Sequence, residues 1–89
     1  MGPVARYLHE KLTEAFAPLE LEVINESHLH AGHHGHDGSG ETHLRIRIVS
    51  DAFADMNRVN RHREVFAIVQ PKIDEGLHAC AIDVKATGE

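Results

Sequence analysis

The stretch over residues 28–36 is the part of this sequence with the clearest capacity for chemistry. It reads His-Leu-His-Ala-Gly-His-His-Gly-His, which places five histidines in nine positions. Imidazole is the commonest neutral metal ligand in proteins, and its charge changes near physiological pH. Because glycine leaves the backbone unconstrained, such a segment can offer several imidazoles to a metal ion with little geometric restriction. These histidines are therefore candidate metal ligands.

Two histidines outside that stretch belong to more regular patterns. His62 falls in the apolar stripe of a predicted helix, where a histidine is more often structural, or a residue that orients a ligand, than a ligand itself. His78 opens a short apolar run and, taken alone, is typical of a strand edge. Cys80 follows two residues later, so both side chains should share one sheet face. Its small apolar neighbours predict a buried, unreactive thiol, and no catalytic residue is predicted.

Arg61 and Arg63 flank His62 and should point outward from the same helix. One interpretation is a solvated basic face. The other is a docking patch for an acidic partner surface or for glutathione carboxylates, which the planar guanidinium group suits. Both interpretations stay open at this point.

Length and composition limit the classes of protein. The 89 residues, 42% of them hydrophobic, predict one small domain over residues 1–89. No apolar run approaches the roughly 18 residues of a membrane span, and the N-terminus lacks the apolar stretch of a signal peptide. A single cysteine excludes an intramolecular disulfide framework, so we expect a cytoplasmic protein without membrane contact. The net charge of −5 opposes strong binding to nucleic acid.

Hydrophobic periodicity predicts the elements that must position these side chains. Apolar residues every four positions predict a helix over residues 3–16, and alternating patterns predict two strands over 19–24 and 43–48. These strands should form an antiparallel hairpin around a long, flexible His/Gly-rich loop at about 28–41. A second helix is expected from Val59 to Ile73, with a kink or restart at Pro71.

The C-terminal part should complete the sheet. Gly76 is a plausible helix C-cap, and the run over 77–84 is typical of a buried strand. A strand–helix–strand unit favours a parallel crossover. The predicted fold is therefore α+β, a three-stranded mixed sheet with the helices packed on one face.

Several short motifs, in order and spread from about residue 4 to 84, resemble the BolA family. They are Asn25-Glu26-Ser27, His30, Glu41-Thr42-His43, Val49-Ser50-Asp51-Ala52-Phe53, Asn60-Arg61-His62-Arg63 and Gly76-Leu77-His78-Ala79. The sequence departs from the family pattern at Asp55, where glycine is frequent, and at Pro71, which many relatives lack. The resemblance implies an αββ(α)αβ fold similar to the type II KH domain, although the GXXG loop of RNA-binding KH modules is missing.

The resemblance also implies a function. BolA-like adaptors bind a monothiol glutaredoxin and share a bridging 2Fe–2S cluster with it and with glutathione, in iron–sulfur trafficking or iron regulation. By this resemblance one ligand is His78, and the loop ligand falls on His30, with His33, His34 and His28 as alternatives. The isolated chain is expected to be a monomer without a cluster, and the complex a heterodimer.

Two other functions remain to be weighed. Some bacterial relatives are described as DNA-binding transcriptional regulators, and the arginines on and before the second helix would serve that role. A protein that binds metal through the His/Gly loop alone is the third interpretation, since such loops have adventitious affinity for zinc, nickel or copper. A stand-alone enzyme is not predicted.

Overall fold

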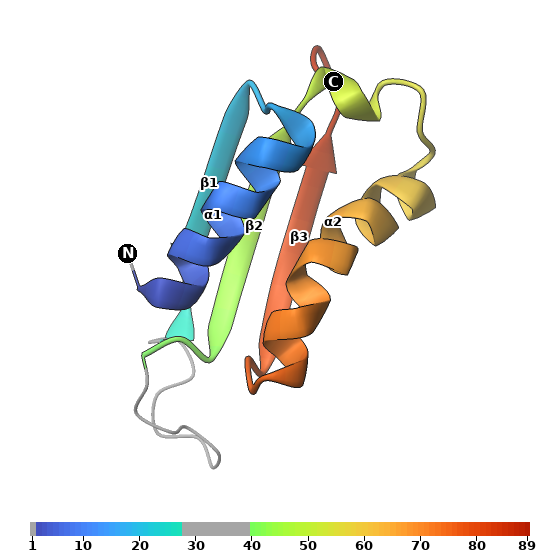
Figure 1. The fold of residues 1–89 in the computed structure, drawn as a ribbon. Helices are drawn as coiled ribbons and strands as arrows, with labels where there is room; N and C mark the ends of the chain where they lie inside the picture. Colours follow the sequence, from blue (N-terminus) through green and yellow to red (C-terminus); the bar gives the residue numbers. More distant parts are fainter. Residues whose placement is uncertain (1, 28–39) are drawn as a thin grey trace.

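The computed structural model describes residues 2–27 and 40–89, which form two helices, a short 3-10 helix and a three-stranded sheet (Figure 1). The elements are α1 (Pro3–Phe16), β1 (Glu20–Asn25), β2 (His43–Val49), η2 (Asp51–Phe53), α2 (Arg58–Asp74) and β3 (Ala79–Lys85). Most of the stretch expected as a long loop, residues 28–39, lies outside the described residues.

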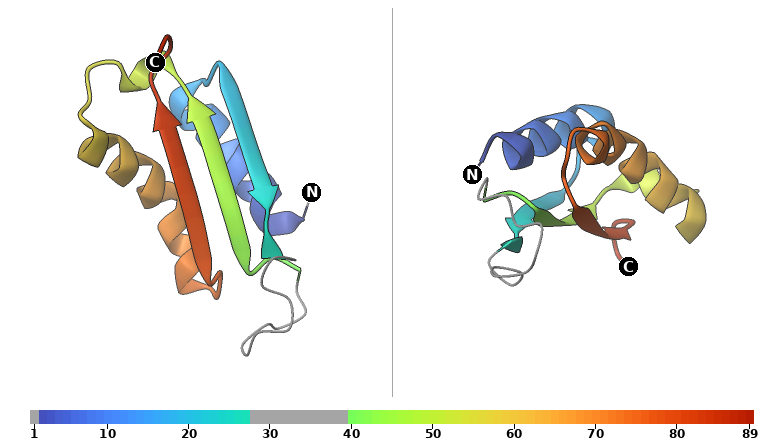
Figure 2. Two further views of the ribbon diagram at one scale, coloured as in Figure 1. Left: turned by 180° about the vertical axis from the view of Figure 1, so that it is seen from behind. Right: turned by 90° about the horizontal axis from the view of Figure 1, so that it is seen from below.

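The sheet has the order β1-β2-β3 and carries both helices on one face (Figure 2). Strands β1 and β2 are antiparallel, with Leu21 opposite Ile48. Strands β2 and β3 are parallel, with Ile46 opposite Ile82. The predicted α+β fold with a mixed sheet is confirmed.

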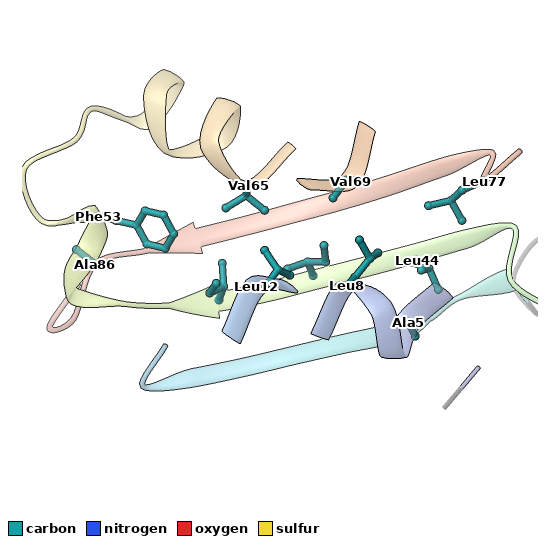
Figure 3. Close-up of a cluster of buried hydrophobic side chains, with 11 residues drawn as sticks. Ala5, Leu8, Leu12, Leu44, Phe53, Val65, Val69, Leu77 and Ala86 are labelled. Atoms are coloured by element: carbon teal, nitrogen blue, oxygen red, sulfur yellow. The ribbon is translucent and has the colours of Figure 1, made fainter. Parts of the chain in front are cut away.

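The core lies between the sheet and the helices (Figure 3). Alternation along β2 turns Leu44, Ile46 and Ile48 toward the helices, which is the period of two expected for a strand with one buried face. Helix α1 contributes Leu8 and Leu12, both fully buried. The opposite face of the sheet carries charged side chains instead, from Glu22, Arg45, Arg47, Asp83 and Lys85.

Helix α1 has a defined start and stop. Pro3 occupies its first turn, where a missing backbone N–H costs nothing. The carboxylate of Glu41 accepts hydrogen bonds from the N–H groups of Val4 (3.2 Å) and Ala5 (2.9 Å). Ala17 ends the helix in the left-handed conformation, and its N–H donates to Thr13 O at 3.0 Å.

Helix α2 differs from expectation in two ways. It continues through Pro71 to Asp74, so the helix does not restart at this proline, which removes only one backbone hydrogen bond. Its buried row is Arg61, Val65 and Val69 rather than a stripe containing His62. Val59, at the start of the expected stripe, is 58% exposed.

Strand β3 is an edge strand and not the buried strand that its apolar composition predicted. Its residues are half-buried or exposed, because no strand pairs with its outer edge among residues 2–27 and 40–89. Small residues such as Ala79 and Ala81 made the run look buried, although they lie on the open face of the sheet.

Candidate functional site

The turn that ends α2 places His78 at the end of the sheet. Gly76, with a φ of 124°, donates its N–H to Ile73 O at 3.1 Å, and Leu77 donates to Lys72 O at 2.9 Å. This pair of bonds is a Schellman motif, which glycine at this position makes possible. Leu77 is 6% exposed and anchors the turn in the core. The next residue, His78, is therefore held at the surface by its buried neighbour Leu77.

The backbone of His78 is fixed, and its side chain is exposed. The N–H groups of His78 and Ala79 both donate to the carbonyl oxygen of Thr42, at 3.0 and 3.1 Å. Thr42 directly precedes β2. His78 thus directly precedes β3 and is hydrogen-bonded to Thr42, which lies between the His/Gly-rich segment and β2.

The motifs Asn25-Glu26-Ser27 and Glu41-Thr42-His43 form a clamp around residues 28–39. The buried hydroxyl oxygen of Ser27 accepts hydrogen bonds from the N–H groups of Thr42 (2.8 Å) and His43 (3.1 Å). The Asn25 side chain accepts from Ser27 N–H at 2.9 Å and donates to the carbonyl oxygen of Gly40. We call these contacts the Ser27–Thr42 clamp. It joins the two described stretches that flank residues 28–39, and Thr42 on one side of it is hydrogen-bonded to His78.

Replacing Ser27 with alanine should lower the free energy of unfolding by about 2–3 kcal/mol, because one buried and one partly buried N–H group lose their acceptor. Chemical denaturation monitored by far-UV circular dichroism measures the change. Thr13→Ala is the matched control, since the Thr13 hydroxyl donates to His9 O on an exposed helix surface. If Ser27→Ala and Thr13→Ala lowered the free energy of unfolding by the same amount, a stabilising role of the clamp would be contradicted.

His43 is a candidate ligand that the sequence analysis missed. Its ring lies beside that of His78, with centroids 4.8 Å apart and ring planes at 61°. Its Nδ1 lies 3.0 Å from the hydroxyl oxygen of Thr42. The signal was available, because parallel strands begin at the same edge of a sheet and these two histidines stand at the starts of β2 and β3.

The loop ligands expected from sequence, His30 and the alternatives His28, His33 and His34, lie outside the described residues. Within residues 2–27 and 40–89, no group of three or more His, Cys, Asp or Glu side chains is arranged to hold a metal ion. The described part therefore offers a pair of imidazoles, and a third protein ligand would have to come from residues 28–39.

Comparison with known proteins identifies the family of this chain. A family model described as BolA-like protein matches residues 12–89. The chain belongs to the BolA family.

Several BolA relatives match over nearly the whole chain. A Sinorhizobium protein described as an uncharacterized protein in the cobS 5′ region is 57% identical, over 92% of this chain and 89% of that protein. SufE-like protein 1 of Arabidopsis thaliana is 42% identical over 100% of this chain, which spans only 25% of that longer protein. The solved structure of BolA1 from Arabidopsis thaliana superposes with a TM-score of 0.85 at 36% identity, covering 100% and 98% of the two chains.

The two arginines expected at a docking surface of this BolA chain separate in the structure. Arg61 is 8% exposed, so the expectation that it points outward was wrong. Its Nε donates to Phe53 O (3.0 Å) and Met56 O (2.9 Å), and its two terminal nitrogens contact the carboxylate of Glu89 at 2.5 and 2.8 Å. Arg61 therefore ties η2, α2 and the residues after β3 together. Arg63 is exposed and remains available for docking.

The Arg61–Glu89 pair predicts a pH dependence of stability. Hydrogen bonds from Arg61 and from the Ala86 N–H lower the pKa of Glu89 from 4.5 to about 2. Since the folded-state pKa is depressed, the stabilisation is fully present above about pH 4.5 and is lost as the pH falls toward 2. Thermal unfolding of the wild type and of Glu89→Gln should therefore differ at pH 6 and converge near pH 2. If the difference in unfolding temperature between the two proteins stayed constant from pH 6 to pH 2, the lowered pKa of Glu89 would be contradicted.

His62 does not lie near the candidate ligands. It is exposed on α2 and stacks on Phe66, with ring centroids 5.9 Å apart and nearly parallel planes. Twelve residues separate it from Asp74 at the other end of α2, which corresponds to about 18 Å of helix. Because β3 begins near that other end (Figure 1), His62 cannot orient His78, and the interpretation as a ligand-orienting residue is wrong.

Cys80 lies on the core side of β3 and is only partly buried, whereas a buried thiol was expected. It is half-buried against the core, and this burial raises the pKa of the thiol to about 11. The thiolate required for metal binding or nucleophilic attack is therefore scarce at neutral pH. The expected shared face with His78 does not occur, because His78 precedes the strand and its ring meets His43 instead.

Among the described residues, no helix is both long and apolar enough to cross a membrane.

Proposed function

We propose that this BolA-family chain is a non-catalytic cytoplasmic adaptor that binds a monothiol glutaredoxin and, with glutathione, shares a bridging 2Fe–2S cluster through His78 and one histidine of residues 28–39. The single observation that carries the proposal is the exposed imidazole of His78 beside the Ser27–Thr42 clamp. The clamp bonds Ser27, which precedes the His/Gly segment, to Thr42, which contacts His78.

The residues at this end of the sheet fit such a cluster in their chemistry. A 2Fe–2S cluster can be held by thiolates on one iron and imidazoles on the other, and imidazole ligation raises its reduction potential relative to thiolate ligation. His78 supplies an imidazole that reaches solvent. The thiolates would come from the partner and glutathione, since burial keeps the thiol of Cys80 protonated.

Different residues of this chain would fix the position of His78 and contact the partner protein. The Schellman turn and the Thr42 carbonyl fix the backbone of His78, so that little conformational entropy remains to be lost when the imidazole binds. The hydrophobic core behind Leu77 keeps the ring at the surface, where a partner protein can approach. Exposed Arg63 is a candidate contact for an acidic partner surface.

Reconstitution tests the proposal. The chain is mixed anaerobically with its organism's monothiol glutaredoxin, glutathione, ferrous iron and sulfide, and visible circular dichroism and native mass spectra are recorded. A heterodimer carrying one 2Fe–2S unit, with a spectrum different from that of the glutaredoxin alone, is the expected result. A glutaredoxin spectrum that does not change on addition of this chain would overturn the proposal.

The alternative function, a DNA-binding regulator, is less well supported by the charges of the described residues. The guanidinium group of Arg61 is turned inward. Arg45 contacts Glu26 at 2.9 Å and Asp83 at 3.4 Å, and Arg47 also reaches Asp83, at 3.7 Å. These partners neutralise cations that phosphate binding would require.

A further inference from the structure

We propose that the outer edge of β3 binds a short acidic peptide segment of a partner protein, which lies extended beside the strand and adds a fourth strand to the sheet. The proposed peptide site is separate from the proposed cluster site, because it lies along the C-terminal half of β3, whereas His78 precedes the other end of the strand. It requires neither a cluster nor the histidines of residues 28–39, so it goes beyond the adaptor function.

The outer edge of β3 offers backbone hydrogen-bonding groups in a regular row. The N–H of Ser50, which directly follows β2, donates to Lys85 O at 3.1 Å, so the backbone groups of Lys85 point toward β2. Because the N–H and C=O groups of successive strand residues point to alternate sides, those of Ile82 and Val84 point to the outer edge. Within the described part of the chain, the sheet has no strand beyond β3. An unpaired row of this kind is a template for a further strand.

A hollow of about 800 Å³ lies along this edge, which is within the range of roughly 300–1,000 Å³ typical of ligand sites. Residues from both faces of the sheet line it: Arg58 and His62 from α2, Arg47 from the open face, and residues 82–85 of β3 itself. The side chains of an added strand point alternately to the two faces, so they would contact both groups of residues. This lining therefore fits an extended segment that pairs with β3.

The charges that line the hollow favour an acidic peptide. The carboxylates of Asp83 and Glu89 already form salt bridges with arginines of this chain. Arg58 and Lys85 form no salt bridge with another described residue, although the charge of Arg58 helps to lower the pKa of Glu89. Arg58 begins α2 and Lys85 ends β3, and these two element ends lie at the same end of the sheet (Figure 1). Two adjacent carboxylates of a peptide would therefore meet opposite charge there.

The position of α2 argues against a second copy of this chain as the occupant. The N-terminal part of α2 extends beyond β3, so it stands beside the free edge (Figure 1, Figure 2). A second copy that paired through its own β3 would bring its own α2 to the same edge, and the two helices would compete for the same space. A single extended segment carries no such helix. Nucleic acid is less favoured, because Glu20 and Glu22 also line the hollow and repel phosphate groups.

Fluorescence anisotropy with a labelled synthetic peptide tests the site. The probe, Glu-Glu-Val-Thr-Val-Thr with blocked ends, places its glutamates beside Arg58 and Lys85 when it pairs antiparallel to β3, and the reversed sequence does so when it pairs parallel. At least one of the two orders is expected to bind, and replacing both glutamates with lysine should weaken binding at least tenfold. Arg58→Ala and Lys85→Ala should each weaken it at least threefold. Lys11→Ala is the matched control and should leave the affinity unchanged, since Lys11 is an exposed lysine of α1 outside the hollow.

Backbone pairing is tested separately from charge. Methylation of one alternate set of peptide amide nitrogens should abolish binding, whereas methylation of the other set should change the affinity less than about threefold, because only one set faces β3. Hydrogen exchange followed by NMR should show that saturating peptide slows the amide exchange of Ile82 and Val84 at least tenfold. The amides of Ala81 and Asp83, which point toward β2, should change little.

Three results would overturn the peptide site. They are absence of binding by both peptide orders, equal effects of methylation on the two sets of amides, and dimerisation of the isolated chain in analytical ultracentrifugation with Ile82 and Val84 already protected, which would assign the edge to a second copy. Failure of peptide binding with an intact glutaredoxin complex overturns the peptide site alone. Peptide binding together with failure of the glutaredoxin reconstitution overturns the adaptor function alone.

Discussion

Replacing His78 with alanine is expected to abolish the visible circular dichroism of the bridged glutaredoxin complex and to leave the fold of the isolated chain intact. The ring of His78 is exposed, so its removal creates no cavity, and surface substitutions of this kind change the free energy of unfolding by about 0.5 kcal/mol. The bonds that hold residues 78 and 79 come from backbone N–H groups, which alanine retains.

The measurement compares the His78→Ala and His62→Ala variants after anaerobic reconstitution with the same glutaredoxin, glutathione, iron and sulfide. His62 is also an exposed histidine, but it lies at the opposite end of α2. The His62 variant should give the wild-type spectrum and heterodimer mass. A wild-type spectrum from the His78 variant would remove His78 from the ligand set.

Replacing Arg61 with alanine is expected to lower the unfolding temperature by on the order of 10 °C, because several hydrogen bonds are lost together. The carbonyl oxygens of Phe53 and Met56 and the carboxylate of Glu89 all lose a donor. Phe53 and Met56 lie together in the turn after β2, whereas Glu89 follows β3. The substitution therefore loosens the turn after β2 and the residues after β3 at the same time.

Arg63→Ala is the matched control for this variant, since Arg63 is exposed two positions further along the same helix. Differential scanning calorimetry should show an unfolding temperature within about 2 °C of the wild type for Arg63→Ala. Affinity for the glutaredoxin should fall in this variant if Arg63 contacts the partner. Similar unfolding temperatures for both variants would contradict an internal role for Arg61.

The fold was predictable because most of its elements are encoded locally. Helix α1 carries apolar residues every four positions and ends at Ala17-Pro18, and β1 and β2 alternate with period two. The parallel pairing of β3 followed from the general preference of strand–helix–strand units. His78 was expected inside a buried strand over 77–84, whereas it directly precedes β3 and is exposed.

The inward-facing row of α2 was not predictable from helical periodicity. Helical spacing allows two different rows of side chains to face the core. One row runs through Val59 and His62, and the other runs through Arg61, Val65 and Val69. The second row is buried because Glu89 and two backbone carbonyls satisfy the guanidinium group of Arg61. These partners come from outside the helix, so a local pattern does not contain them. His43 was overlooked for a different reason. Its ring lies beside that of His78 only because β2 and β3 pair in parallel, and this pairing joins residues that are distant in sequence.

The Ser27–Thr42 clamp separates the two ligand positions of the proposed cluster site, His78 and a histidine of residues 28–39. Because the chain is gripped on both sides of residues 28–39, the intervening stretch can change in length or composition without shifting the imidazole at the start of β3. Doubling its length would cost only about 0.6 kcal/mol in closure entropy. In the proposed complex we therefore expect that exchanging a histidine of residues 28–39 for cysteine or a carboxylate changes one cluster ligand and leaves His78 in place.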